Sequence, residues 1–330
     1  MLKVYDIGTD EAGRPWARLT DVNGMPVGEY RRQGRIKFII ALVLLALLAC
    51  WSVWGQTSKP VIYDALGHAG KPAVIPGTLK MAVVPSFSHT GNLTPAMLEG
   101  RLDDPVMWRH VDKYVTPDAA AVCLNIEGEW EGQNIAPGYE LESGVRRERY
   151  ERAAALVLAV KAKYRRPVGC YFFPPVMWTQ HDGPSDRYVE VIRQSRPLME
   201  AVDFVCPSLY MAYSFGGDMR QWRLWSESVV ERTRVEMSLT WDWRGHRRKP
   251  IYPFLAPVYE WGVEPKSLWG KSITKTRLAE QVAWCRANAD GCVLWGGVEV
   301  HDGATPLPWA LDMKTKQPGW DWVAEAVGSK

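Results

Sequence analysis

The chain has 330 residues, 47% of them hydrophobic, and a formal net charge of +3. This length allows one large domain with a short appendage, and the scattered basic residues give no support for nucleic-acid binding. The six cysteines lack the spacing of a metal site, and we expect neither a metal nor a cofactor.

The first segment, residues 1–35, is polar and contains short alternating runs of apolar and polar residues. Such runs allow a small hairpin or a segment without regular structure, and the pattern does not decide between them.

Residues 36–54 form the clearest pattern in the chain, an almost entirely apolar segment. Its uncharged part is about 17 residues long, close to the ~20 that cross a bilayer core of ~30 Å. Four basic residues stand just before that part: Arg31, Arg32, Arg35 and Lys37. The positive-inside rule therefore predicts a single-pass membrane protein, with residues 1–35 in the cytoplasm and residues 55 onward outside it. A buried core helix is the alternative, and residues 55–77 are interpreted as a stalk.

From residue 78 to 330, apolar strands alternate with helical patterns. Strands are expected at 79–85, 120–127, 167–174, 202–210, 251–258 and 291–298. Helices are expected at 95–114, 146–164, 185–201, 218–233, 274–289 and 320–327. Uniformly apolar strands that alternate with helices indicate a parallel sheet buried on both faces. Because no glycine-rich phosphate loop follows the first strand, we predict an irregular TIM-like (β/α) barrel of six or seven strands.

The second of these strands ends in polar residues. Alternation along the strand places Asn125, Glu127 and Glu129 on one side. Acidic residues at the end of a buried parallel strand are typical of the catalytic end of a barrel. The alternatives are a solvated loop entry, or a glutamate paired with an arginine.

Aromatic residues follow the other strands. The candidates are Tyr171, Tyr210, Tyr213, Tyr259 and Trp295. Carboxyl groups and aromatic rings around one cavity suit glycoside chemistry, although Tyr210 and Trp295 could equally be core aromatics. Only one strand end carries a tight acidic cluster. That argues against two carboxylates facing each other across the cavity. It is compatible with substrate-assisted hydrolysis, in which the 2-acetamido oxygen of a sugar attacks the anomeric carbon.

Six strand segments, in the right order, resemble those of the hyaluronidase family. They are Leu79–Ser86 (LKMAVVPS), Val122–Trp130 (VCLNIEGEW), Gly169–Pro174 (GCYFFP), Pro207–Tyr210 (PSLY), Pro250–Pro253 (PIYP) and Val293–Gly296 (VLWG). The resemblance covers roughly residues 79–298. It implies an irregular barrel that cleaves N-acetylhexosaminide bonds.

The resemblance also implies roles for individual residues. Glu127 takes the place of the catalytic acid/base, Tyr210 that of the tyrosine holding the acetamido group, and Trp295 that of the tryptophan packing against the sugar. Asn125 stands where the family has an aspartate, and an amide offers no negative charge to the developing oxazolinium. Glu129, Tyr171, Tyr213 and Tyr259 are further candidates for substrate binding.

Two functions remain open. The first is a membrane-anchored glycosidase that acts on an N-acetylhexosamine-containing glycan polymer by acid/base catalysis with Glu127. The second is a catalytically inactive barrel that serves as a glycan-binding or structural protein on a cell or particle membrane. A third reading is a glycosidase that uses a different carboxylate, such as Glu129 or Glu260.

Overall fold

The computed structural model describes residues 3–9, 15–20, 26–31, 60–66, 74–85, 87–88, 91–92, 100–126, 143–171, 173, 186–210, 218–240, 248–257, 273–296, 301–302, 305–306 and 321–328. The chain divides into two compact units, residues 1–58 and residues 59–330.

The first unit contains a three-stranded antiparallel sheet. Its strands β1 (Lys3–Thr9), β2 (Pro15–Thr20) and β3 (Pro26–Arg31) pair in the order β1-β2-β3. The sequence did not decide whether this region forms a hairpin or has no regular structure. The structure has a three-stranded antiparallel meander. The predicted membrane span, residues 36–54, lies outside the described residues. Among the helices that the structure does describe, none is both long and apolar enough to cross a bilayer.

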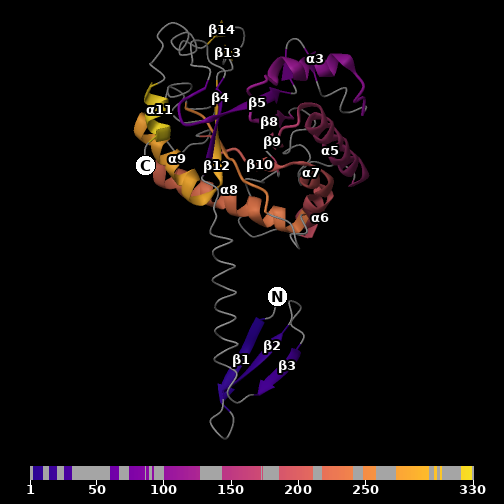
Figure 1. Cartoon of the computed structure of the whole chain (residues 1–330), viewed down its shortest axis with the longest axis vertical. Coiled ribbons are helices and arrows are strands. Elements are labelled where there is room, and N and C mark those ends of the chain that lie inside the picture. The colour runs from indigo at the N-terminus through magenta and orange to yellow at the C-terminus, as the bar shows by residue number, and fades with distance from the viewer. Residues whose placement is uncertain are drawn as a thin grey trace. The chain divides into compact units, whose positions relative to one another are not determined.

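The second unit is a barrel of parallel strands (Figure 1). The strands are β4 (Val61–Leu66), β5 (Leu79–Pro85), β8 (Ala121–Asn125), β9 (Val168–Tyr171), β10 (Phe204–Cys206), β11 (Phe254–Leu255) and β12 (Gly291–Gly296). They pair in the order β10-β9-β8-β5-β4-β12-β11. Backbone bridges from Val205 to Ile251 and from Ser208 to Phe254 join the two ends of this series, so the seven strands form a closed ring.

Strand β4 corrects the expected stalk. It pairs with β12 on one side and β5 on the other, so residues 61–77 belong to the barrel unit. Asp64 interrupts the apolar run of this short strand. The Pro and Gly residues on either side of the strand therefore suggested a linker. In the fold the buried Asp64 carboxylate accepts the amide N–H groups of Leu66 at 3.1 Å and of Ile75 at 2.9 Å. These bonds compensate for its burial.

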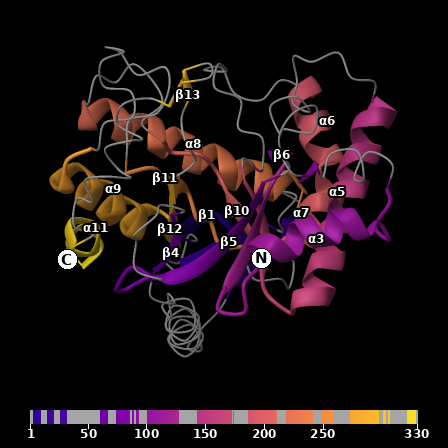
Figure 2. The same ribbon diagram turned by 90° about the horizontal axis from the view of Figure 1, so that it is seen from above.

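Helices surround the ring, with α9 and α11 on one side and α3, α5 and α6 on the other (Figure 2). Their bounds are α3 (Pro105–Tyr114), α5 (Ser143–Tyr164), α6 (Asp186–Gln194), α7 (Arg196–Ala201), α8 (Met219–Thr240), α9 (Lys275–Asn288) and α11 (Asp321–Gly328). Two short hairpins follow β5 and β12. They are β6 (Phe87–Ser88) with β7 (Gly91–Asn92), and β13 (His301–Asp302) with β14 (Thr305–Pro306).

Two helices differ from their expected ranges for local reasons. Helix α3 begins at Pro105 rather than near residue 95, because the Asp104 side chain accepts the Val106 amide and caps the helix there. The helix expected over 185–201 is divided at Ser195 into α6 and α7. Pro197 explains the break, since it has no N–H and its ring would clash with the carbonyl of residue 193 in a continuous helix.

Successive residues along each strand alternate between two apolar cores, one outside and one inside the barrel. Ile62, Val84, Val122 and Leu124 face outward and pack with the helices. The residues between them fill the interior of the barrel: Tyr63, Met81, Val83, Ala121, Cys123, Phe204, Cys206, Tyr252, Phe254 and Val293. This two-sided burial explains why the strands read as continuous apolar runs. The five cysteines in the described part are buried free thiols.

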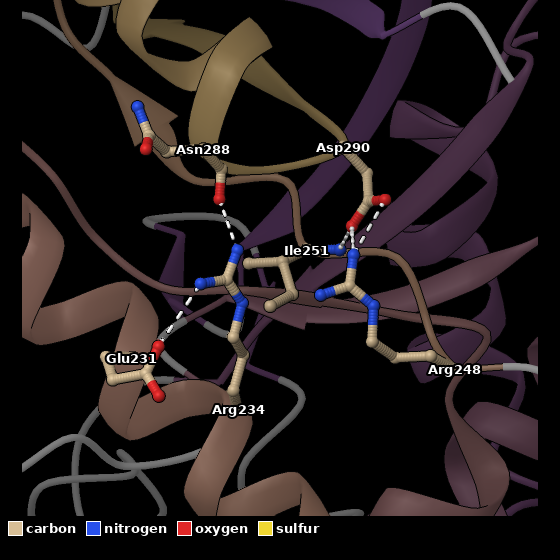
Figure 3. Close-up of polar contacts among 6 residues, drawn as sticks. All are labelled: Glu231, Arg234, Arg248, Ile251, Asn288 and Asp290. Atoms are coloured by element: carbon tan, nitrogen blue, oxygen red, sulfur yellow. Dashed lines mark hydrogen bonds and ion pairs between the residues drawn. The ribbon is translucent and has the colours of Figure 1, made fainter. Parts of the chain in front are cut away.

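Polar contacts tie the amino ends of the strands together (Figure 3). Asp290, just before β12, accepts the Ile251 amide at 2.9 Å and the Arg248 guanidinium at 3.0 Å. Asp203, just before β10, likewise accepts the Val168 amide at 2.9 Å and the Lys161 ammonium at 2.7 Å. In each case a carboxylate just before one strand accepts a backbone N–H near the start of the neighbouring strand. This end of the barrel is occupied by structural contacts, which leaves the carboxyl end for a site.

Candidate functional site

The carboxyl end of the barrel carries a continuous line of aromatic rings. Tyr171 at the end of β9 stacks with Tyr210, with ring centroids 6.0 Å apart and planes inclined by 25°. Tyr171 also contacts Phe254 at 4.9 Å, and Phe254 contacts Trp295 at 6.2 Å. We call these four residues the aromatic line. Tyr171, Tyr210 and Trp295 are half-buried, and their rings pack against the interior core of the barrel.

Tyr210 lies beyond the last residue of β10 but is held by the seam that closes the barrel. The Leu209 amide donates to the Phe254 carbonyl at 2.9 Å. The Trp222 indole of α8 donates to the Leu209 carbonyl at 3.2 Å. Two hydrogen bonds therefore fix the backbone immediately before Tyr210, which places its ring beside Tyr171.

The interior below the aromatic line is packed. Tyr63, Phe204 and Tyr252 form a mutual ring contact, with centroid distances of 6.4, 5.1 and 5.4 Å. Gly169 makes room for this layer, because a Cβ atom there would lie 2.3 Å from the Phe204 ring. Ring packing therefore closes the barrel below, and a ligand must approach the aromatic line from the carboxyl end.

Asn125 is the last residue of β8 and is 6% exposed. It pairs in register with Pro85, the last residue of β5. The His110 ring of α3 donates to the Pro85 carbonyl through Nε2 at 2.7 Å and so holds the end of β5 in place. Sequence reasoning did not select His110, because a histidine inside a helical pattern carries no local indication of a strand-end contact.

The predicted site residues fall into two groups. The structure brings Tyr171 and Tyr210 into direct contact and links Trp295 to them through Phe254. Glu127, Glu129, Tyr213 and Tyr259 lie outside the described residues, so their roles remain predictions. Phe254 was missed, although its position in the alternating run of 251–255 could have indicated an inward residue.

The described residues offer limited chemistry besides the aromatic rings. They contain no group of three His, Cys, Asp or Glu side chains that could hold a metal ion. Burial, followed by the neighbouring Cys206 thiol, raises the pKa of Cys123 well above its usual value. Cys123 is therefore a protonated thiol at neutral pH and a poor nucleophile.

A second buried polar cluster lies outside the barrel, where α5, α6 and α8 supply Arg146, Tyr150, Gln194 and Glu236. Arg146 donates to Gln194 at 3.5 Å, the upper limit of hydrogen-bond length. Burial raises the pKa of Glu236 well above its usual value, and burial together with the nearby Glu236 raises the pKa of Tyr150. The Tyr150 ring packs beside Phe173 at 6.3 Å, so this cluster supports the wall behind β9.

Comparisons with known proteins give matches in structure alone. No protein-family profile and no curated protein sequence matches the chain. The crystal structure of bee venom hyaluronidase is 13% identical, with a TM-score of 0.49, and the match covers 82% of this chain and 99% of that one. Bee venom hyaluronidase in complex with a hyaluronic acid tetramer is 12% identical, with a TM-score of 0.48, over 72% and 90% of the two chains. A GH128 exo-β-1,3-glucanase from Aureobasidium namibiae is 12% identical, with a TM-score of 0.33, over 71% of each chain. Because these TM-scores are below 0.5, the barrel assignment rests on the strand pairing above.

Proposed function

We propose that the chain is a membrane-anchored glycoside hydrolase that cleaves an N-acetylhexosamine-containing glycan outside the cytoplasm. The observation that carries this proposal is the aromatic line at the carboxyl end of the barrel. Three half-buried rings in one row suit the flat faces of successive sugars or of a sugar and its acetamido group.

In the proposed mechanism Glu127 is the general acid and then the general base. Glu127 follows Asn125, the last residue of β8, by two positions in the sequence, and strand alternation continued beyond β8 would put the two side chains on one side. It would give its proton to the leaving glycosidic oxygen while the acetamido oxygen of the substrate attacks the anomeric carbon. Water, deprotonated by Glu127, would then open the oxazolinium ring and restore the sugar. Tyr210 and Asn125 would hold the acetamido group and Trp295 would pack against it.

The second candidate is a glycan-binding barrel without catalysis, and Asn125 is the observation that favours it. This residue is 6% exposed at the end of β8. Losing one preorganised electrostatic contact to a developing charge costs about 10²–10³ in rate. An amide in place of a carboxylate could therefore leave glycan binding intact while removing turnover.

Membrane anchoring is supported by the composition of residues 36–54 and by the basic residues before them. In this arrangement the protein spans the membrane once, with its N-terminus in the cytoplasm. The barrel begins at Val61, only a few residues after the proposed span.

The deciding experiment measures glycan cleavage by the detergent-solubilised full chain. Wild type is compared with Glu127→Gln on hyaluronan, chitin oligosaccharides and peptidoglycan fragments. Glu148→Gln, an exposed glutamate on α5, serves as the matched control. Cleavage that is lost in Glu127→Gln and kept in Glu148→Gln supports the hydrolase. Saturable binding without cleavage by any of the three proteins supports the binding barrel.

A further inference from the structure

Two of the buried cysteines come from consecutive elements on the outer side of the barrel. Cys285 lies in the last turn of α9, and Cys292 is the second residue of β12. Both are fully buried in the outer apolar core. Only Ala289 and Asp290 separate the end of the helix from the start of the strand. The chain therefore turns directly from the helix into the strand on which it packs, and both cysteines lie close to this turn.

The periodicities of the helix and the strand direct the two side chains toward each other. Val282 and Cys285 lie on the buried side of α9, three residues apart. In β12, Cys292 and Leu294 face the outer core, whereas Val293 between them faces the inner core. The inner side of the helix therefore meets the outer face of the strand. A thiol–thiol hydrogen bond joins Cys285 to Cys292 at this contact.

Hydrogen bonds from other elements hold this turn in place. The Arg234 guanidinium of α8 donates to the Asn288 carbonyl, the last residue of α9, at 2.6 Å (Figure 3). The Asp290 amide donates to the Ile251 carbonyl at 3.1 Å. The end of α9 and the start of β12 are thus fixed to neighbouring parts of the barrel, which keeps the two thiols in contact.

A second pair of buried thiols, Cys123 and Cys206, has a different backbone geometry. These two thiols also share a hydrogen bond. Cys123 lies in β8 and Cys206 in β10, and β9 lies between these strands. Two strand spacings of ~4.8 Å place their backbones roughly 10 Å apart. A disulfide requires Cα atoms within about 7 Å of each other, so this pair stays reduced.

We propose that Cys285 and Cys292 form a disulfide when the chain folds in the presence of a small-molecule disulfide such as oxidised glutathione. Each cysteine thiol loses its proton, and one S–S bond forms between the two sulfur atoms. The S–S bond of oxidised glutathione breaks and takes up two electrons and two protons, which gives two glutathione thiols. The new bond clamps α9 to β12, three residues before Trp295. The proposal depends neither on the proposed membrane span nor on the proposed glycosidase activity.

The burial of the thiols places this reaction before the outer core closes. Burial, followed by the hydrogen bond to Cys292, raises the pKa of Cys285 well above its usual value. The thiolate is the reactive form in thiol–disulfide exchange, so the folded, reduced protein reacts slowly. The disulfide therefore forms during folding and is afterwards shielded from reductants.

The test synthesises the full chain in a cell-free system with detergent and a mixture of oxidised and reduced glutathione. N-ethylmaleimide then blocks the free thiols. Trypsin cleaves after Arg286, between the two cysteines, so a disulfide joins peptides 278–286 and 287–314. We expect mass spectrometry to find these peptides joined, and Cys123 and Cys206 as maleimide adducts. Chain synthesised under reducing conditions and oxidised only after folding should form the joined peptides at least about tenfold more slowly, because its thiols are buried.

Thermal unfolding of matched variants measures what the disulfide contributes. The Tm of wild type should be about 5 °C higher for oxidised than for reduced chain, because closing this short loop restricts the unfolded state. Cys123→Ala should keep this difference, and Cys285→Ala should lose it. Both positions are fully buried, so each variant removes one buried thiol.

Three results would overturn the proposal. The first is maleimide on both Cys285 and Cys292 after oxidative synthesis, and the second is a disulfide from either of them to another cysteine. The third is equally fast oxidation of the folded, reduced chain, which would refute formation before burial. A disulfide between Cys123 and Cys206 would refute the strand-spacing argument that separates the two pairs.

Discussion

The carboxylate of Asp290 accepts the backbone N–H of Ile251 at 2.9 Å, across the sheet from the start of β12 to the chain entering β11 (Figure 3). We expect Asp290→Ala to lower the free energy of unfolding by about 1–3 kcal/mol, because a part-buried amide loses its acceptor. Arg248→Met removes only the exposed ion pair, and its expected cost is below about 1 kcal/mol. Urea unfolding of both variants checks this order, and equal losses would show that the ion pair rather than the amide bond matters.

Gly169 lies against the Phe204 ring and leaves no room for a side chain. A Cβ atom there would meet the Phe204 ring at 2.3 Å and the Phe204 carbonyl oxygen at 2.8 Å. Gly169→Ala is expected to destabilise the barrel by about 1–3 kcal/mol through overpacking. Adding Phe204→Leu should return part of that loss by making room, which a double-mutant cycle in urea measures. If Phe204→Leu lowers the free energy of unfolding as much in Gly169→Ala as in wild type, the two positions do not compete for space.

The burial of the Glu236 carboxyl group predicts an unusual dependence of the free energy of unfolding on pH. Within the described part of the chain neither of its carboxylate oxygens has a hydrogen-bond partner, and burial raises its pKa well above the usual value. Folding raises the pKa of this carboxyl above its unfolded value of about 4.5. Its contribution to the free energy of unfolding is therefore fully present below pH 4.5 and is lost as the pH rises through the folded pKa.

Glu236→Gln should therefore remove a decline in stability that wild type shows as the pH rises above about 4.5. Urea midpoints at pH 4.5, 6 and 8 measure this. Glu231→Gln is the control, since Glu231 is an exposed, ion-paired residue of the same helix. A decline that persists unchanged in Glu236→Gln would assign it to other groups.

Asn125 supplies a gain-of-function test of the proposed chemistry. If the site uses an acetamido nucleophile, Asn125→Asp should raise kcat by about 10²-fold, because a carboxylate stabilises the developing positive charge. Initial rates on the glycan that wild type binds measure this effect. Asn288→Asp, at the end of α9, serves as the control for the added charge. A fall in kcat with Asn125→Asp would indicate that the amide itself is the functional group.

Trp295 forms one end of the aromatic line, 6.2 Å from Phe254. Trp295→Leu should weaken glycan binding about fivefold to tenfold, on the scale of ~1 kcal/mol for one ring contact. Isothermal titration with oligosaccharides of increasing length measures this. Tyr164→Phe, an aromatic change on the outer helix α5, is the control. Unchanged affinity in Trp295→Leu would make Trp295 a core residue.

The local parts of the fold follow from residues that are neighbours in the chain. Continuous apolar runs such as 79–85 and 291–296 identify strands buried on two faces, and the amphipathic pattern of 146–164 identifies a covering helix. These patterns are short-range, because strand alternation and helical period act over a few residues. The barrel class and the aromatic candidates Tyr171, Tyr210 and Trp295 could therefore be predicted from the sequence.

The remaining features depend on contacts between distant residues. Strand β4 is recognisable only because β5 and β12 pair with it, and its Asp64 is tolerated only because Ile75 returns to donate an amide. Phe254 joins Tyr171 to Trp295, although these rings come from β9, β11 and β12. The sequence by itself determined six of the barrel's strands and most of its helices, and it offered Tyr171, Tyr210 and Trp295 as candidates for a site. Only the tertiary structure decided how the barrel closes and which aromatic side chains touch. Parallel strands that pair are separated by dozens of residues in the sequence, and the sequence of one strand does not specify which other strand it pairs with.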